Sequence, residues 1–282
     1  MTAEAALLAI ATSVAAGLMG SFAVMRRMSL AADPLSHVAL PGIGLALALH
    51  REPIFGAVAA LLVGAVLVWV LEDKTQVTTE AIIGVVFSAA LAIGSLTTSG
   101  EDLIDALLGA GGVPTVAELV FVLIAAIGIV VFLIAERNRL VVMIISPDLA
   151  HTAGVNARRV DLAYLLLFAL TIGIGLRYLG VLLMGALIII PAVTAKGIAR
   201  NLCQMLVISV TLAVLATVVG ASAASRLQLG TGPVVVLVAA TAFLLSLLLP
   251  RGSAPAEAEL PGDLSIGKSL GDHVEDISER SK

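Results

Sequence analysis

The sequence has little charge, few aromatic residues and a single cysteine. Charged residues make up 13% and aromatic residues 4% of the 282 positions, whereas hydrophobic residues make up 60%. The mean hydropathy of +1.11 is far from that of a soluble globular domain. Cys203 alone cannot form a disulfide within the chain, so we expect it to serve in packing. The composition therefore predicts an integral membrane protein.

The charges that are present indicate orientation rather than a charged partner. A net charge of -4 suggests neither nucleic acid nor an acidic partner. The chain starts without basic residues, and Arg26-Arg27 follows the first apolar run, which is not the order of a signal peptide. We therefore expect a retained first helix, with the N-terminus outside and Arg26-Arg27 in the cytoplasm.

Apolar runs divide most of the chain into segments near or somewhat under the about 20 residues that a spanning helix needs. They cover residues 5–25, 36–50, 54–71, 81–97, 116–135, 160–178, 179–196, 203–224 and 233–249. The second run is short unless residues 28–35 also enter the membrane. Within residues 1–250, eight of the twelve Lys and Arg residues fall in the resulting inner loops, 26–35, 72–80, 136–159 and 197–202, and Lys196 borders the last of them. We predict an all-α polytopic membrane protein of about nine transmembrane helices, with a transmembrane domain over residues 1–250.

Small residues recur at every fourth position in several runs, which predicts closely packed helices. These stripes are Gly56, Ala60 and Gly64; Gly84, Ser88 and Ala92; and Ser209, Ala213, Thr217, Ala221 and Ser225.

The composition changes after Pro250. Residues 251–282 are acidic and poor in apolar side chains, so we expect a disordered cytoplasmic tail. Residues 262–269 match the phosphate-binding pattern G-x-x-x-x-G-K-[ST]. Such a loop works only between a buried strand and a helix, and Pro261 precedes a stretch without a strand, so we reject nucleotide binding here.

Asp33 and His37 are the main candidate site. Four residues apart on a helix, they lie on one face and can contact the same ion. A carboxylate and a neutral imidazole suit zinc, manganese or ferrous iron, but two ligands are too few for a tight structural site. The pair therefore predicts a transit site for a divalent metal ion, which in a two-fold dimer would converge with its copy. The alternative is a helix cap at Asp33 and an interfacial His37.

Two further segments accompany this pair. Pro41, Gly42 and Gly44 predict a helix break beside the translocation path or, alternatively, close packing of a neighbouring helix against glycine. In the longest inner loop, Ser146 is a suitable N-cap, followed by Pro147 at the first helical position, while Gly154 can end the helix. We predict a short cytoplasmic helix there.

Three motifs resemble the permease subunits of bacterial zinc, manganese and iron ABC importers. The first runs from Arg26-Arg27-Met28 through Asp33-x-x-Ser36-His37 to Pro41-Gly42. The second is the stretch from Gly180 to Ala195, with Pro191 near its end. The third is the inner loop at residues 147–156, which resembles the family's ATPase-coupling segment and includes Pro147, Asp148, Leu149, Ala150, His151 and Gly154. The three motifs occur in the family's order.

The resemblance implies a homodimer with the helical arrangement of the vitamin B12 and siderophore (type II) importers. It also implies two separate ATP-binding cassette subunits and an extracytoplasmic metal-binding protein. The expected location is the bacterial cytoplasmic membrane, with the surrounding lipid as a further partner. The chain itself is then no enzyme and holds no permanent cofactor, because the divalent metal ion is its cargo, carried past Asp33 and His37.

Two alternatives stay open from the sequence. One is an ABC importer permease for a metal chelate. The other is a self-sufficient secondary metal transporter or channel, although we find no clear internal repeat and no group of mid-membrane charges. The ligand chemistry does not choose among zinc, manganese and iron.

Overall fold

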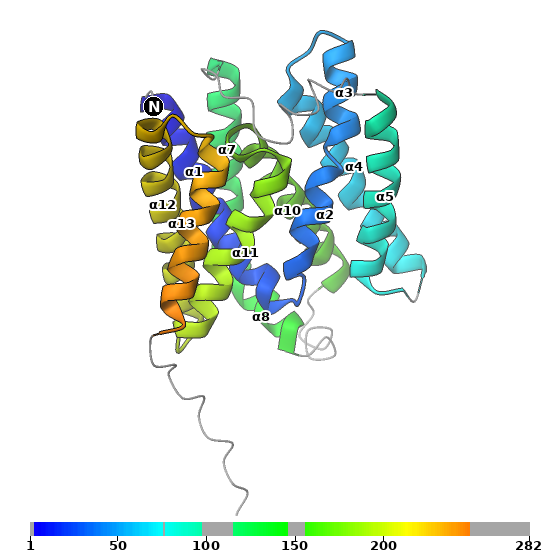
Figure 1. The fold of residues 1–282 in the computed structure, drawn as a ribbon. Helices are drawn as coiled ribbons and strands as arrows, with labels where there is room; N and C mark the ends of the chain where they lie inside the picture. The colour runs from blue at the N-terminus through cyan, green and yellow to red at the C-terminus, as the bar shows by residue number, and fades with distance from the viewer. Residues whose placement is uncertain (1–2, 76, 98–114, 146–155, 249–282) are drawn as a thin grey trace, which may run out of the picture. The chain divides into compact units, whose positions relative to one another are not determined.

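A computed structural model describes residues 3–75, 77–97, 115–145 and 156–248, and every regular element in these ranges is a helix (Figure 1). The elements are α1 (Ala3–Met25), the 3-10 helix η1 (Ser29–Ala31), α2 (Ala32–His37), α3 (Leu40–Ala48), α4 (Pro53–Lys74), α5 (Thr79–Thr97), α7 (Val116–Ala135), α8 (Arg137–Ile145), α10 (Ala157–Leu179), α11 (Val181–Ile198), α12 (Leu202–Leu227) and α13 (Thr231–Ser246). Together they form a bundle whose core is made of buried apolar side chains.

The predicted spans correspond to helical segments of this bundle. Within the described ranges, seven segments are long and apolar enough to cross a membrane, and the second of them runs over Ser29–Ala48. Two shorter apolar helices cover Leu183–Ile198 and Thr231–Ser246. The apolar run at 36–50 was too short to cross a membrane alone, and residues 29–35 extend it in the second span. The all-α polytopic fold is confirmed.

Local sequence explains where several helices begin and end. Thr115 accepts a hydrogen bond from the backbone N–H of Glu118, whose carboxylate accepts one from the N–H of Thr115, and this capping box starts α7. Gly180 alone separates α10 from α11, with a φ of 74° that is open to glycine without a steric penalty. The junction at Gly180 therefore produces two helices from one continuous apolar stretch.

One helix was missed by the sequence. Residues 136–159 were assigned to an inner loop, but Arg137–Ile145 forms α8, with Leu140 buried against the bundle. The basic start and the few apolar residues after it are too short a pattern to distinguish a helix from a loop. The short helix expected from Pro147 to Gly154 lies outside the described residues, as do the acidic tail and its phosphate-loop-like segment.

The stripes of small residues have different surroundings. On α12, the Ser209 hydroxyl donates to the carbonyl oxygen of Gly17 at 2.7 Å, and Thr217 shares a 2.6 Å hydrogen bond with Ser13, so this stripe packs against α1. On α5, by contrast, a Cβ added at Gly84 would meet no described atom within 4 Å. Among the described residues, the α12 stripe packs against another helix, whereas Gly84 of the α5 stripe has no such neighbour.

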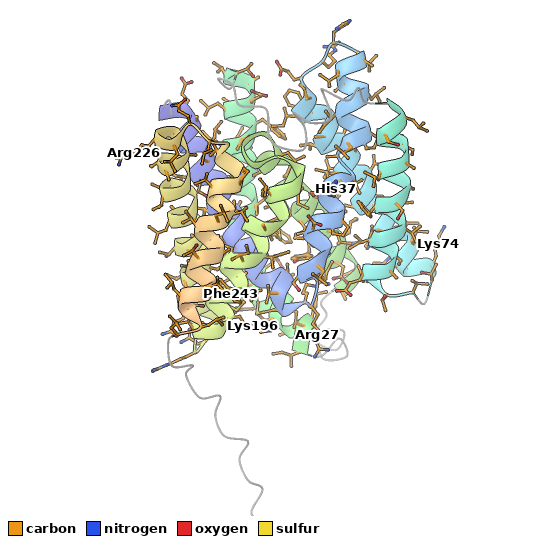
Figure 2. The ribbon with its side chains drawn as sticks, viewed as in Figure 1. Arg27, His37, Lys74, Lys196, Arg226 and Phe243 are labelled. Carbon is orange, nitrogen blue, oxygen red and sulfur yellow. The ribbon has the colours of Figure 1, made fainter. Side chains whose placement is uncertain are left out.

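Charged residues mark the two ends of the bundle. Arg27 and Lys196 lie at one end and Arg226 at the opposite end, while His37 lies between them (Figure 2). This separation agrees with the grouping of the basic residues that the sequence indicated.

Candidate functional site

A tight turn delivers the chain from α1 to the candidate site. The N–H of Arg27 donates to the carbonyl of Val24 and that of Met28 to the carbonyl of Ala23, the pattern that ends a helix in a Schellman motif. Arg27 takes the left-handed conformation with a φ of 60°. The chain then forms η1 and the single turn and a half of α2, which contains both candidate ligands.

Asp33 and His37 lie on the same short helix, inside a span. Asp33 is exposed, and none of the ion pairs found among the described residues involves it. The N-cap of α2 is Ala31, without a side-chain hydrogen bond, so Asp33 sits in the first helical turn and is not the cap. Its carboxylate acts electrostatically on the His37 imidazole. The geometry thus leaves a carboxylate free for a cation next to a histidine.

His37 is half-buried and is held by an aromatic neighbour. Its ring meets the Phe87 ring of α5 edge to face, with 5.4 Å between the ring centroids and an interplanar angle of 60°. The Nδ1 atom of His37 is buried and has no hydrogen-bond partner among the described residues. A neutral imidazole held in this way retains a nitrogen for a metal ion.

The described part of the chain provides only a sparse ligand set. It contains no group of three or more His, Cys, Asp and Glu side chains that could hold a metal ion together. One Asp and one His are fewer than the four ligands of a structural zinc site, so a single copy of the pair suits weak contact rather than permanent binding.

Two of the sequence motifs meet at this site. A Cβ added to Gly185 of α11 would lie 3.0 Å from the Cα atom of Asp33, so the backbones of α2 and α11 touch here. The Ser36 hydroxyl donates to the carbonyl oxygen of Asp33 at 2.7 Å. Gly185 belongs to the stretch from Gly180 to Ala195, the second of the three motifs that resemble the family. The close approach gives that motif a physical role in supporting Asp33.

The structure places the helix interruption just before Pro41. Val38 and Ala39 separate α2 from α3, and Pro41 lies in the first turn of α3, where its missing N–H leaves no bond unmade. A Cβ on Gly42 would overlap the carbonyl oxygen of Gly56, which fits the packing interpretation of this glycine. Gly44 is buried within α3.

Residues 147–156, which the family resemblance predicts to be an ATPase-coupling segment, lie outside the described residues except for Asn156. The side-chain oxygen of Asn156 accepts a hydrogen bond from the N–H of Arg159 at 3.2 Å and so caps α10. The described residues therefore resume at Asn156, the last residue of that segment.

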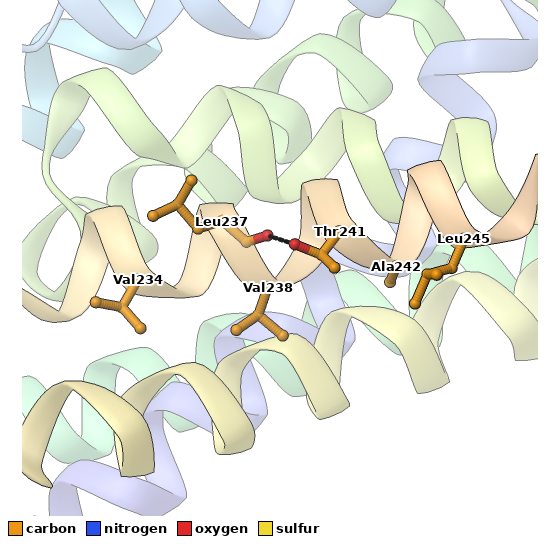
Figure 3. A pocket seen from close by; sticks show the side chains of 6 residues that line it. All are labelled: Val234, Leu237, Val238, Thr241, Ala242 and Leu245. Carbon is orange, nitrogen blue, oxygen red and sulfur yellow. Dashed lines mark hydrogen bonds between the residues drawn. The ribbon is translucent and has the colours of Figure 1, made fainter.

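One apolar groove runs along α13, lined by Val234, Leu237, Val238, Thr241, Ala242 and Leu245 (Figure 3). Its single hydroxyl, on Thr241, already donates to the carbonyl oxygen of Leu237 at 2.7 Å. The groove presents no free polar group and is not a candidate ion site.

Sequence reasoning missed the residues that support the two ligands. Phe87 is an ordinary aromatic residue in an apolar run, and nothing in its local pattern indicates a contact with His37. Gly185 carried a weak signal, as a glycine within a helix interior where only close packing favours it.

Known proteins with similar sequences are membrane subunits of metal uptake systems. The chain is 30% identical over 249 residues to the high-affinity zinc uptake system membrane protein ZnuB of Haemophilus influenzae, covering 86% of this chain and 95% of that protein. It is 29% identical over 252 residues to the manganese import system permease protein ScaB of Streptococcus parasanguinis, covering 87% and 89%. It is also 30% identical over 244 residues to the chelated iron transport system membrane protein YfeD of Yersinia pestis, covering 85% and 82%.

Solved structures and a family model agree with these relatives. PsaBC from Streptococcus pneumoniae in complex with Fab superposes with a TM-score of 0.76 at 26% identity, over 91% of this chain and 93% of that chain. A putative metal-chelate type ABC transporter in an inward-facing conformation shares the fold, with a TM-score of 0.62 at 20% identity, over 86% and 84%. The model of the ABC 3 transport family matches residues 1–250. The chain therefore belongs to the ABC 3 transport family.

Proposed function

We propose that this chain is the membrane-spanning permease of an ATP-driven importer of zinc, manganese or ferrous iron, with Asp33 and His37 contacting the ion in transit. The observation that carries the proposal is the exposed Asp33 inside the Ser29–Ala48 span. A carboxylate inside a membrane span is costly when it faces lipid, so Asp33 is expected to face a polar path instead.

The weakness of the site supports transit over storage. An ion that must enter and leave needs contacts that are favourable but incomplete, and one Asp with one His from each chain provides such contacts. The relatives carry zinc, manganese or iron according to their names, and this ligand pair is compatible with all three.

The proposal includes further subunits and an orientation. Hydrolysis of ATP belongs to a separate ATP-binding cassette subunit, and the metal arrives on an extracytoplasmic binding protein. Two copies of the permease form a homodimer, for which the unpartnered stripe of Gly84, Ser88 and Ala92 on α5 offers a surface. The end with Arg27 and Lys196 faces the cytoplasm of a bacterial inner membrane, following the positive-inside rule.

Reconstitution tests this function. The chain would be incorporated into proteoliposomes with its ATPase and binding protein, and uptake of zinc, manganese and ferrous iron would be measured with and without ATP. We expect ATP-dependent accumulation of one of these ions. Uptake that proceeds equally without ATP would contradict the proposal and favour a channel or secondary transporter.

A further inference from the structure

Two ion pairs hold the first turn of α10 to two different helices. Arg158 pairs with Asp73 at the end of α4, with 2.5 Å between Nη2 and Oδ2. Asp161, three residues later, pairs with Arg26, which directly follows α1. Arg158 thus connects the start of α10 to α4, and Asp161 connects it to the residue that follows α1.

The pair with Arg26 is the more buried of the two. The Arg26 and Asp161 side chains are 19% and 32% exposed, against 58% and 39% for Arg158 and Asp73. The Arg26 guanidinium also lies over the ring of the fully buried Tyr164 of α10, 4.5 Å from the ring centroid. Partly desolvated charges interact more strongly than exposed ones, and losing one partner leaves the other without compensation.

Arg158 has a second anchor on α4 that does not depend on Asp73. Trp69 of α4 donates from Nε1 to the carbonyl oxygen of Arg158 at 3.1 Å, and its ring centroid lies 4.7 Å from the guanidinium. An exposed ion pair contributes little by itself. Removing the charge of Asp73 should therefore leave α10 attached to α4.

Arg26 stands at the start of the segment that carries the candidate ligands. Its own N–H donates to the carbonyl of Phe22, so it is still fixed to α1. The turn at Arg27 and the short η1 then lead directly to Asp33, whose backbone is confined on the other side by Gly185. Because few residues separate Arg26 from Asp33, a displacement of Arg26 should also move Asp33.

We propose that Arg26 and Asp161 are positioning residues that couple movement at the start of α10 to the segment holding Asp33 and His37. Asp161 follows by five positions Asn156, the last residue of the proposed ATPase-coupling segment. Movement driven by the ATPase would reach α10 first and, through the ion pair, the turn after α1. This inference rests on the proposed function, because it needs an ATP-driven change between two states of the permease.

The test compares metal transported per ATP hydrolysed in proteoliposomes containing the complete transporter. In Asp161→Asn, which keeps the side-chain shape and removes the charge, we expect this ratio to fall by about fivefold or more while ATP hydrolysis continues. Asp161→Glu keeps the carboxylate and should stay near the wild-type ratio. Equal losses in the Asn and Glu variants would overturn the role of the charge.

Asp73→Asn is the matched control, since it makes the same change in the other ion pair of the same helical turn. We expect its ratio to match that of the wild type. A wild-type ratio in both Asp161→Asn and Arg26→Gln would overturn the inference, and so would an equal loss in Asp73→Asn and Asp161→Asn. Absence of ATP-dependent uptake in the wild type would instead reject the proposed function, so the two failures are distinguishable.

Discussion

The imidazole of His37 and the phenyl ring of Phe87 meet edge to face, although they belong to helices α2 and α5 that are far apart along the chain. The contact covers part of the imidazole ring and limits how the ring can rotate. In the proposed transit site, Phe87 would act on the metal only through His37.

Replacing the aromatic ring of Phe87 with a smaller apolar side chain should weaken metal transport without unfolding the protein. In Phe87→Leu we expect the metal concentration for half-maximal uptake to rise by about tenfold, because a loosely held ligand misplaces its nitrogen. Uptake kinetics in proteoliposomes measure this. The control is Phe55→Leu, since Phe55 forms a similar edge contact with Phe121 at 5.5 Å on α4 and α7. Identical kinetics for Phe87→Leu and the wild type would argue against a positioning role.

Removing both candidate ligands should abolish ATP-dependent uptake. The double variant Asp33→Ala, His37→Ala leaves α2 without a carboxylate or an imidazole to replace the water around a divalent ion. His50→Asn is a suitable control, because His50 has a φ of 52° and asparagine tolerates that conformation. Uptake by the double variant at the wild-type rate, in transporter of equal purity and assembly, would reject the site.

The crossing of α3 and α4 should depend on the absence of a side chain at Gly42. In Gly42→Ala the new methyl group would overlap the carbonyl of Gly56, and we expect a loss of about 1–3 kcal/mol in unfolding free energy. Denaturant unfolding in detergent measures this.

Gly128→Ala makes the same substitution on α7 without a neighbour within 4 Å, so its stability should equal or slightly exceed that of the wild type. Equal unfolding of the two alanine variants would contradict the close approach of α3 and α4.

The helices themselves could be predicted with good accuracy, because each is a local property of an apolar run. The predicted run at 116–135 coincides with α7, and the run at 160–178 differs from α10 by a few residues at its start. The missed helix was α8, whose pattern is too short to stand out. The neighbouring positions of Asp33 and His37 on one helix also followed from spacing alone.

The sequence by itself determined the membrane class, the positions of the spans and the pair of potential ligands. Tertiary structure alone decided what surrounds them: Phe87 against His37, Gly185 against Asp33, and Arg26 against Asp161. The physical reason is that apolar helix faces are nearly equivalent in lipid, so partners are selected by close packing and by a few polar contacts between distant segments. The periodic small residues predict that helices pack closely, but neither they nor single polar residues identify the partner helix.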